Sequence, residues 1–459
     1  MRYTVSFEET GYDQLTKHLF SGNTEMAAYL LCRVAQCDEE LRLLVREIIP
    51  VEADDVISAS TGHMSIRSRS FLRVLKRAHL TGQCFIFTHS HPKNVPNHSP
   101  QDDEEEKKLF ATTFVRVENA PIHASIVFSF PDRPSGRVWL PNGTTEPIER
   151  VRVIGARFRF HVNDSDGGRI PPIYDRQVRA FGKDFQRIVR KLHFGVVGNG
   201  GTGSAVTEQL IRLGAGEISV FDERMFADTN VTRVYGSRVV DVDIPKVKLM
   251  ERLAADIGLG TLVHPHVGNI TRLQQIKYLK SCDVVFCCTD DQWGRSLLTR
   301  FALYYYVPVI DVGVKIDSQE GIVHSVQGRV TLLVPGSACL FCRRRIAPQA
   351  VAAESIKSAN PEEANELRRQ GYIPELEEQA PAVIPFTTTV AASAITEFAH
   401  RLTGFMGTDR TATEILHLID SGRIRTNSTP PDPNCAICGD RTCWGRGDVS
   451  PLLDTIWPD

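Results

Sequence analysis

The sequence predicts an α/β protein of more than one domain, with a doubly wound, mostly parallel sheet in its C-terminal half. Three observations lead to this fold class. The chain has 459 residues, enough for two or three domains at about 150 residues each. Hydrophobic residues make up 42% and charged residues 24%, as is usual for globular proteins. From residue 174 onward, short apolar runs alternate with helical patterns, which is typical of a parallel sheet.

Charge balance and hydropathy exclude two classes of protein. Lys and Arg total 53 against 55 Asp and Glu, whereas a dedicated nucleic-acid binder carries a strongly basic domain. No run reaches the roughly 18 uninterrupted apolar residues of a membrane span, and the opening residues MRYTVSFEET lack the apolar core of a signal peptide. We therefore expect a cytoplasmic protein that binds neither nucleic acid nor membranes.

The first domain is expected over residues 1–155. Strand-like apolar runs lie at 84–90 and 122–130, and the segment from Glu25 to Val34 has the pattern of a helix. The acidic run 102–106 is interpreted as the solvated start of another helix, where negative charge is favourable.

A polar linker containing Gly and Pro, residues 156–173, is expected to lead into a second domain over 174–459. There HFGVVG predicts a buried strand, NGGTG a turn, SAVTEQLIRLGAG a helix and EISVFD the next strand. CDVVFCCTD and VPVIDVGV predict two further strands. The polar segment 346–380 is expected to form an irregular crossover loop, followed by a helix at about 387–403, a hairpin and a cysteine pair.

Two histidines at the end of the strand predicted over 84–90 suit a metal site. His89 and His91 alternate along the strand, so both imidazoles face the same side, and Asp102 adds an oxygen ligand. Three protein ligands and an open fourth position are typical of a hydrolytic zinc, because the metal acidifies water. Ser99 is placed to donate a hydrogen bond to an oxyanion. A bare H-x-H pair is usually a solvated surface feature, and His98 is interpreted as a bystander.

The pattern H-x-H-x7-S-x2-D at residues 89–102 resembles the JAMM (JAB/MPN) metalloprotease family. The resemblance implies a JAB/MPN α/β domain with a catalytic zinc, which cleaves isopeptide or peptide bonds after the C-terminus of a ubiquitin-like protein. The general base of the family is a glutamate before an early apolar run. That run corresponds to EMAAYLL here and makes Glu25 the candidate, although Ala28 or Tyr29 replaces the family's glycine.

A glycine turn between a predicted strand and a predicted helix is suited to bind phosphate. Glycines let backbone amides approach an anion, and the helix N-terminus adds positive potential. Asp222 ends the next strand, 19 residues after the last turn glycine, where it can accept a ribose hydroxyl. The same glycines also suit plain packing of helix on sheet, and the turn alone would equally fit NAD or FAD. The turn residues are Gly198, Gly200, Gly201, Gly203 and Ser204.

Residues beyond this carboxylate favour a triphosphate over a dinucleotide. Asn230, Arg233 and Lys246 bring an amide and two cations to a region where a dinucleotide needs no further charge. Asp290 follows the strand CDVVFCCTD and is placed to bind Mg²⁺, and its position after a threonine favours it over Asp291.

The segment 174–445 resembles the ThiF/MoeB/ubiquitin-activating adenylyltransferase family. YDRQ carries Arg176, which in the family enters the ATP site of the neighbouring subunit and so implies a homodimer. G-x-G-G-x-G-S matches the glycine turn, DERMFADTNVTR matches the element that contacts ribose and phosphate, Lys246 matches the downstream lysine, and the T-D pair matches the magnesium aspartate. The resemblance implies a Rossmann-like domain that uses ATP and Mg²⁺ to adenylate the C-terminal glycine of a ubiquitin-like protein. The chain departs from the family pattern at Arg224 and Val234.

Eleven cysteines are too sparse for a disulfide scaffold, but four of them form two C-x-x-C pairs. We interpret these pairs as a closed Cys₄ zinc site that ties a loop to the C-terminal segment, as in the family it resembles. A redox-active C-x-x-C is the alternative. The four residues are Cys339, Cys342, Cys435 and Cys438.

Many relatives transfer the activated carboxylate to a cysteine of the crossover loop, yet residues 343–434 contain none. Three interpretations stay open. The protein stops at the acyl-adenylate, which we favour; or a cysteine of the zinc motif doubles as nucleophile; or a hydroxyl serves. The hydroxyl candidates are Ser355, Ser358, Thr387, Thr388 and Thr389.

Together these features predict a bifunctional enzyme of a bacterial ubiquitin-like pathway, which trims or removes a ubiquitin-like protein and adenylates its C-terminal glycine. The resemblance implies a conjugating-enzyme homologue as acceptor and a place in anti-phage conjugation operons. Activation of a sulfur-carrier protein for cofactor or metabolite biosynthesis is the alternative. A non-catalytic NAD-binding scaffold is a third hypothesis, which predicts no ATP–pyrophosphate exchange.

Overall fold

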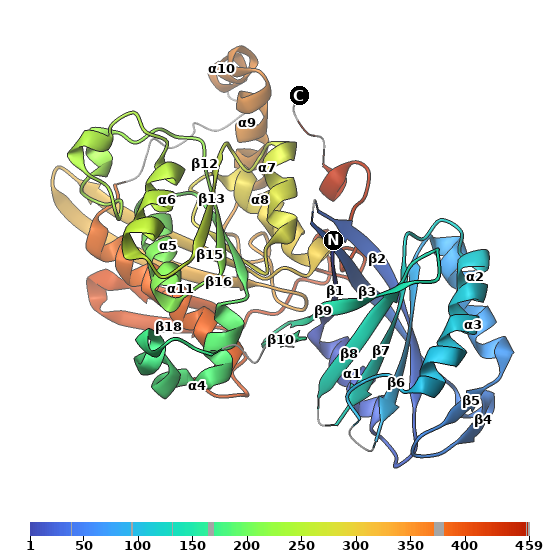
Figure 1. Cartoon of the computed structure of the whole chain (residues 1–459). Helices are drawn as coiled ribbons and strands as arrows, with labels where there is room; N and C mark the ends of the chain where they lie inside the picture. The colour runs from blue at the N-terminus through green and yellow to red at the C-terminus, as the bar shows by residue number, and fades with distance from the viewer. Residues whose placement is uncertain are drawn as a thin grey trace. The chain divides into compact units, whose positions relative to one another are not determined.

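The chain divides into two compact units in a computed structural model (Figure 1). The first unit consists of Met1–Gly167 together with Tyr304–Tyr306 and Trp444–Val449, and the second holds the rest. No helix of the described part of the chain is long and apolar enough to cross a membrane. The structure describes residues 1–37, 39–92, 95–130, 132–163, 169–370, 381–455 and 457.

Among its described residues, the first unit combines an eight-stranded mixed sheet with three α-helices and a small two-stranded ribbon. Its helices are α1 (Glu9–Leu19), α2 (Ser68–Thr81) and α3 (Pro100–Arg116). The ribbon pairs β4 (Val56–Ala59) with β5 (Met64–Ile66). The large sheet contains β1 (Arg2–Glu8), β2 (Ala27–Gln36), β3 (Glu40–Pro50), β6 (Cys84–His91), β7 (His123–Ser129), β8 (Arg133–Trp139), β9 (Thr145–Ile154) and β10 (Phe158–Val162).

The large sheet runs in the order β1-β3-β2-β6-β7-β8-β9-β10 and curves back on itself, because β1 also pairs with β9. Helices α2 and α3 lie side by side against β6 and β7, whereas α1 packs on β1 and β3 (Figure 1). The core between these layers is aliphatic and aromatic, and it includes Leu30, Phe85 and Phe110.

Two expectations for this unit are wrong. The segment expected as a helix from Glu25 to Val34 is instead strand β2, which lies between β3 and β6. Its first six residues are buried without interruption, so pairing on both sides overrides the helix propensity of Ala and Leu. The linker expected over 156–173 contains strand β10, which pairs antiparallel with β9. Residues 164–168 of that linker lie outside the described residues.

The second unit contains a second eight-stranded sheet. Its strands are β11 (His193–Val197), β12 (Glu217–Asp222), β13 (Leu262–Val267), β14 (Val284–Cys287), β15 (Val309–Gln319), β16 (Ile322–Leu333), β17 (Glu414–Leu418) and β18 (Arg423–Asn427). Its helices are α4 (Asp175–Val189), α5 (Gly201–Leu213), α6 (Lys246–Ile257), α7 (Leu273–Tyr278), α8 (Gln292–Tyr305), α9 (Pro348–Ala359), α10 (Pro361–Arg369) and α11 (Ile384–Thr403).

The strand order of this sheet is β13-β12-β11-β14-β15-β16-β17-β18. The first five strands in this order, from β13 through β15, are parallel to one another. Strands β16, β17 and β18 continue the sheet with antiparallel pairing. Helices α5 and α6 lie on one side of the parallel strands, and α7 and α8 lie on the other (Figure 1). The unit therefore has the expected doubly wound, mixed α/β architecture, and its strand order reverses between β11 and β14, the position at which such sheets bind ligands.

The polar segment expected as an irregular crossover loop over 346–380 is largely helical, which corrects the prediction. Helix α9 begins at Pro348, and Asn360 caps α10 by accepting a hydrogen bond from the Glu363 N–H at 3.2 Å. Acidic residues in the first turn of α10 and arginines in its last turn complement the helix dipole. Residues 371–380 of the predicted loop lie outside the described residues.

Candidate functional site

In the first unit, three segments converge on one group of side chains. His89 and His91 end strand β6, and Asp102 lies in the first turn of α3. Strand β2 runs antiparallel to β6, with Ala27 opposite His89, so Glu25, two residues before β2 begins, lies at the same end of the sheet. The register of two strands and the start of one helix thus bring the four predicted residues together.

The three candidate ligands have the spacing of a single-ion site. His89 Nε2 lies 3.1 Å from His91 Nε2, and the two nitrogens lie 3.3 and 3.4 Å from the Asp102 carboxylate oxygens. Ligand atoms about 2.0–2.1 Å from a tetrahedral zinc are separated by about 3.3 Å. The donor set and its geometry therefore fit Zn²⁺.

Neighbouring groups orient these ligands. His91 Nδ1 lies 3.1 Å from the Val95 carbonyl oxygen, which can only accept, so Nδ1 carries the proton and Nε2 presents a lone pair to the cluster. Burial alone would raise the pKa of Asp102, but the neighbouring imidazoles of His89 and His91 and the Ser99 N–H hold it well below its usual value. Asp102 is thus a carboxylate at every ordinary pH.

Glu25 combines burial with proximity to the three ligands. Its residue is 6% exposed, and burial raises the pKa of its carboxyl, while the positive influence of His89 and His91 opposes the rise. A carboxylate whose pKa lies above the usual value is suited to accept a proton near neutral pH.

Ser99 is the N-cap of α3. Its hydroxyl oxygen accepts the Asp102 N–H at 3.2 Å, and the Asp102 carboxylate accepts the Ser99 N–H at 2.6 Å. This reciprocal capping box fixes Asp102 relative to the helix. Because the Ser99 hydroxyl oxygen is the acceptor in this contact, the contact does not use the hydroxyl proton, which can therefore be donated to an oxyanion.

Sequence reasoning missed a buried network behind this cluster. Glu106 was expected in a solvated acidic run, yet it is buried and accepts hydrogen bonds from Ser125 at 2.6 Å and Arg137 at 2.7 Å. His98, expected as a bystander, lies 3.5 Å from Glu106 and 3.1 Å from Ser125. Burial lowers the pKa of His98 to about 3, so its ring is neutral. A glutamate four positions after Asp102, on the same helix face, was the available signal.

In the second unit, the glycine turn connects β11 to α5. Gly198 has φ of +87°, which favours glycine, and Gly200 is the N-cap of α5. A Cβ on Gly203 would lie 1.8 Å from the Gly198 carbonyl oxygen, whereas a Cβ on Gly200 would meet nothing within 4 Å. The turn is therefore tightly packed toward the helix and open at its N-terminus, where a phosphate group fits. Gly201 also lies in the first turn of α5.

The predicted cations gather around this turn. Lys246 begins α6 and is buried, and burial lowers the pKa of its ammonium, with Arg233 and Arg224 adding to the effect and Asp222 and Asp290 opposing it. The other four charged side chains therefore all lie close enough to Lys246 to act on it electrostatically. A buried lysine held near two arginines is suited to bind an anion.

The side chains of Asp222 and Ser204 bind backbone N–H groups of the loops around the nucleotide site. The Asp222 carboxylate accepts the N–H groups of Asn199 at 2.7 Å and Arg224 at 2.8 Å, which ties the end of β12 to the glycine turn. The Ser204 hydroxyl accepts the Tyr235 N–H at 3.1 Å. Asn230 is buried and its side chain accepts the Ala227 N–H at 3.1 Å, which closes the loop that carries the arginines.

The two candidate magnesium ligands differ in their surroundings. Asp291 accepts hydrogen bonds from the Thr289 hydroxyl and the Gly294 N–H. Its carboxylate is therefore already engaged in stabilising the first turn of α8. The Asp290 side chain is 69% exposed and lies 3.5 Å from Arg224. Asp290 is therefore the carboxylate with room for a hydrated Mg²⁺ ion.

Arg176 lies in the first turn of α4 and is exposed, away from the packing of its own unit. Of the five hydroxyl candidates for a nucleophile, the three threonines are hydrogen-bonded within the fold. Thr387 and Thr389 donate to carbonyls of their own helix, and Thr388 shares a hydrogen bond of 2.9 Å with Tyr235. These contacts favour a site that ends at the acyl-adenylate.

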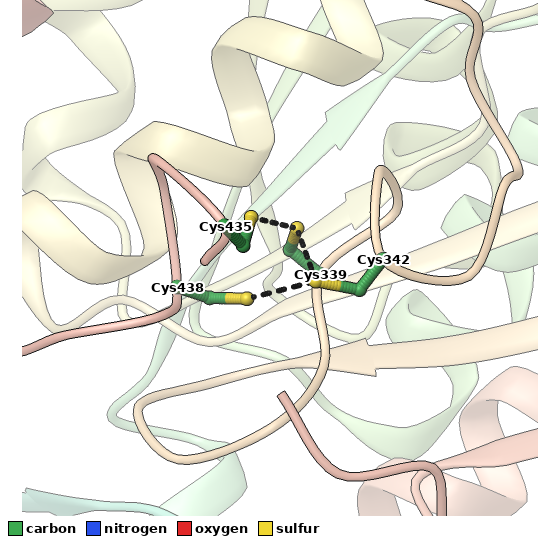
Figure 2. A group of neighbouring side chains, drawn as sticks. All are labelled: Cys339, Cys342, Cys435 and Cys438. Carbon is green, nitrogen blue, oxygen red and sulfur yellow. Dashed lines mark hydrogen bonds between the residues drawn. The ribbon is translucent and has the colours of Figure 1, made fainter. Parts of the chain in front are cut away.

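Four sulfur atoms from two distant segments of the second unit point toward one another (Figure 2). The Sγ–Sγ distances are 3.7 Å for Cys339–Cys342, 3.6 Å for Cys339–Cys435 and 3.3 Å for Cys342–Cys438. Sulfurs about 2.3 Å from a tetrahedral zinc are separated by about 3.8 Å, so the cluster fits a closed zinc site. Hydrogen bonding among the thiols, above all with Cys438, lowers the pKa of Cys339 to about 5 and favours its thiolate.

Two further residues of the nucleotide region were missed. Asn199 is fully buried and donates to the Lys246 carbonyl at 2.9 Å, while its Oδ1 has no hydrogen-bond partner among the described residues. Glu354 of α9 accepts the Trp293 N–H at 2.7 Å at the start of α8. The polar residue inside the glycine turn was a signal for Asn199, but nothing in the sequence pattern relates Glu354 to α8.

Comparison with known proteins bears on the second unit. The model of the ThiF family matches residues 174–437, more than half of the chain. Ubiquitin-like modifier-activating enzyme 5 of Gallus gallus is 26% identical over 228 residues, which cover 47% of this chain and 51% of that protein. The SAMP-activating enzyme E1 of Haloferax volcanii is 25% identical over 154 residues, covering 34% and 54%. The chain thus spans about half the length of these curated relatives.

Among solved structures, E. coli MccB with ATP is similar, with 17% identity, a TM-score of 0.45 and coverage of 59% of this chain and 75% of that chain.

Proposed function

The chain belongs to the ThiF family, and we propose that its second unit uses ATP and Mg²⁺ to adenylate the C-terminal glycine of a ubiquitin-like protein. The observation that carries this proposal is the group of cations around an open glycine turn. Arg224 and Arg233 both act electrostatically on Lys246, whose carbonyl accepts a hydrogen bond from Asn199 of the glycine turn. The similarity to modifier-activating enzymes supports a small protein as the substrate.

In the proposed step, an oxygen of the terminal glycine carboxylate attacks the α-phosphorus of ATP. A bond forms between this oxygen and phosphorus, the bond from the α-phosphorus to the bridging oxygen breaks, and pyrophosphate leaves with that oxygen. Lys246 and Arg233 stabilise the charge that accumulates on the phosphates. Asp290 is the residue we propose to hold Mg²⁺, which neutralises phosphate charge when bound.

We further propose that the acyl-adenylate is released directly to the nucleophile of a conjugating-enzyme homologue. No cysteine lies in residues 343–434, and the nearby threonine hydroxyls are hydrogen-bonded within the fold. Arg176, exposed on α4, is proposed to complete the ATP site of a second copy in a homodimer.

ATP–pyrophosphate exchange tests the adenylation. We expect exchange only with a small protein that ends in glycine, and none with the same protein lacking that residue. Arg233→Ala should lower exchange, whereas Arg238→Ala, an exposed arginine of the following loop, should not. Exchange that is independent of the terminal glycine would contradict the proposal, and so would wild-type exchange by Arg233→Ala.

We propose a second activity for the first unit, the zinc-dependent hydrolysis of the bond after the C-terminal glycine of the same ubiquitin-like protein. This JAB/MPN-type activity is supported by the spacing of His89, His91 and Asp102. A zinc ion bound there acidifies water and polarises the scissile carbonyl. Glu25 takes the proton of the attacking water and passes it to the leaving amine, while the Ser99 hydroxyl donates to the developing oxyanion.

Cleavage of a fusion that extends past the glycine tests this activity. His89→Ala and Glu25→Gln should each abolish cleavage, but only His89→Ala should also lower the zinc content. Glu25→Gln keeps the size of the side chain but cannot accept the proton of water, so loss of cleavage with wild-type zinc content identifies Glu25 as the base rather than a ligand. Cleavage that survives both substitutions would refute the assignment.

Both activities would serve a bacterial, cytoplasmic conjugation pathway, one of the kind found in antiviral defence. Activation of a sulfur-carrier protein is the second candidate, since the same adenylate can accept sulfur. A conjugating-enzyme homologue encoded beside this chain would favour conjugation, and a sulfurtransferase would favour sulfur transfer.

A further inference from the structure

At the edge of the second sheet where its parallel strands begin, three side chains form a group outside both proposed sites. They are His193 on β11, Glu217 on β12 and His264 on β13, and their ligand atoms all lie within 4.8 Å of one another. We propose that this group binds a single divalent transition-metal ion, for which Zn²⁺ is the probe.

The register of the sheet explains why these side chains share one face. His193 pairs with Glu217, and Ser219, two residues further along β12, pairs with His264. Side chains two residues apart on a strand point to the same face. The 2.9 Å contact between His193 Nε2 and the Ser219 hydroxyl confirms that β11 and β12 present these residues to one side.

The donor set suits a borderline metal ion rather than Ca²⁺ or Mg²⁺. Two imidazoles and one carboxylate with open positions are ligands for Zn²⁺ and neighbouring transition metals. His264 Nε2 already lies 3.1 Å from the Glu217 carboxylate, and the His193 and His264 rings are 5.7 Å apart. The His264 and Glu217 side chains are 44% and 36% accessible, so both are open to an ion from solvent beside the buried His193.

A further histidine of β13, His266, packs beside the group. His266 contacts the same Ser219 hydroxyl at 3.3 Å and is stacked between the rings of Phe221 and Tyr278. The stacking of His266 holds strand β13 in place, while the side chain of His264 stays accessible to solvent. The nucleotide turn follows the opposite ends of the same strands, so an ion here would join the edge strand β13 to the central strand β11 without entering that site.

Zinc titration of the full chain tests the proposal. The parent for the test is His89→Ala, which removes a ligand from the first-unit cluster whatever its function, with the Cys₄ site filled as purified. We expect one additional equivalent of Zn²⁺ by calorimetry and a rise in melting temperature with zinc. His264→Ala and Glu217→Gln in this parent should each weaken the additional binding at least tenfold and remove the rise.

His324→Ala is the matched control, because His324 is an exposed histidine on β16 outside the group. It should leave the additional equivalent intact. Circular dichroism of each variant without added zinc verifies folding, and Glu217→Gln keeps the size of the side chain. The proposal is overturned if the parent binds no additional zinc, or if His264→Ala and Glu217→Gln bind it as tightly as the parent; His264 and Glu217 are then only an ion pair.

Discussion

Substitution of Gly203 by alanine perturbs the nucleotide turn without changing any charge. The added Cβ would lie 1.8 Å from the Gly198 carbonyl oxygen, whereas real Cβ contacts essentially never fall below 3.0 Å. The start of α5 and the end of β11 must therefore separate by more than about 1 Å. Such overpacking costs about 1–3 kcal/mol of the free energy of unfolding. A displacement of about 1 Å at a reacting centre lowers turnover by about a hundredfold.

We expect Gly203→Ala to lower ATP–pyrophosphate exchange by about two orders of magnitude and to lower the melting temperature of the second unit by several degrees. Gly200→Ala is the matched control for stability, since its Cβ meets nothing within 4 Å and its φ of −81° suits alanine. Its melting temperature should equal or exceed that of the wild type. Wild-type exchange and stability in Gly203→Ala would refute the account of this turn.

Three further predictions concern single side chains. Lys246→Ala should lower exchange by about 10- to 100-fold, because a charge-assisted hydrogen bond contributes about 1.5–3 kcal/mol, whereas Lys248→Ala, exposed on the same helix, should not. Cys435→Ser should remove one equivalent of zinc by elemental analysis and lower the melting temperature, and unchanged zinc content would exclude the Cys₄ site. Asp311→Ala should lower the free energy of unfolding in urea by about 3–5 kcal/mol, because it leaves the largely buried Arg295 and Arg329 without their fully buried partner. Burial opposes ionisation of Asp311, but its arginine partners hold its pKa below the ordinary 3.8. Its contribution is thus complete above that pH and is lost as the pH falls through the lower folded value, so the difference from wild type should shrink only in strong acid.

The sequence predicted the second unit well because its signals are local. A strand, a glycine turn and a helix follow one another without interruption, and Asp222 closes the next strand. The helix expected from Glu25 failed for a non-local reason, since only pairing with β3 and β6 makes that apolar run a strand.

In the candidate sites, too, residues close together in the sequence were predicted, whereas residues that depend on distant partners were not. His89, His91 and Asp102 lie within 13 positions along the chain, and their motif predicted a shared site. Glu106 was misjudged because its partners, Ser125 and Arg137, come from strands later in the chain. Helix α10 was missed because it is polar on most faces, so that its cap Asn360 carries the signal rather than apolar periodicity.

The central claim is that one chain processes and activates the same C-terminus. Its most direct test is mass spectrometry of a ubiquitin-like precursor that extends past its glycine, incubated with the full chain, zinc and ATP·Mg²⁺. We predict AMP on the trimmed terminus with the wild type and none with His89→Ala, which should still adenylate a precursor that already ends in glycine. Adenylation of the untrimmed precursor, or no AMP on either form, would contradict the claim.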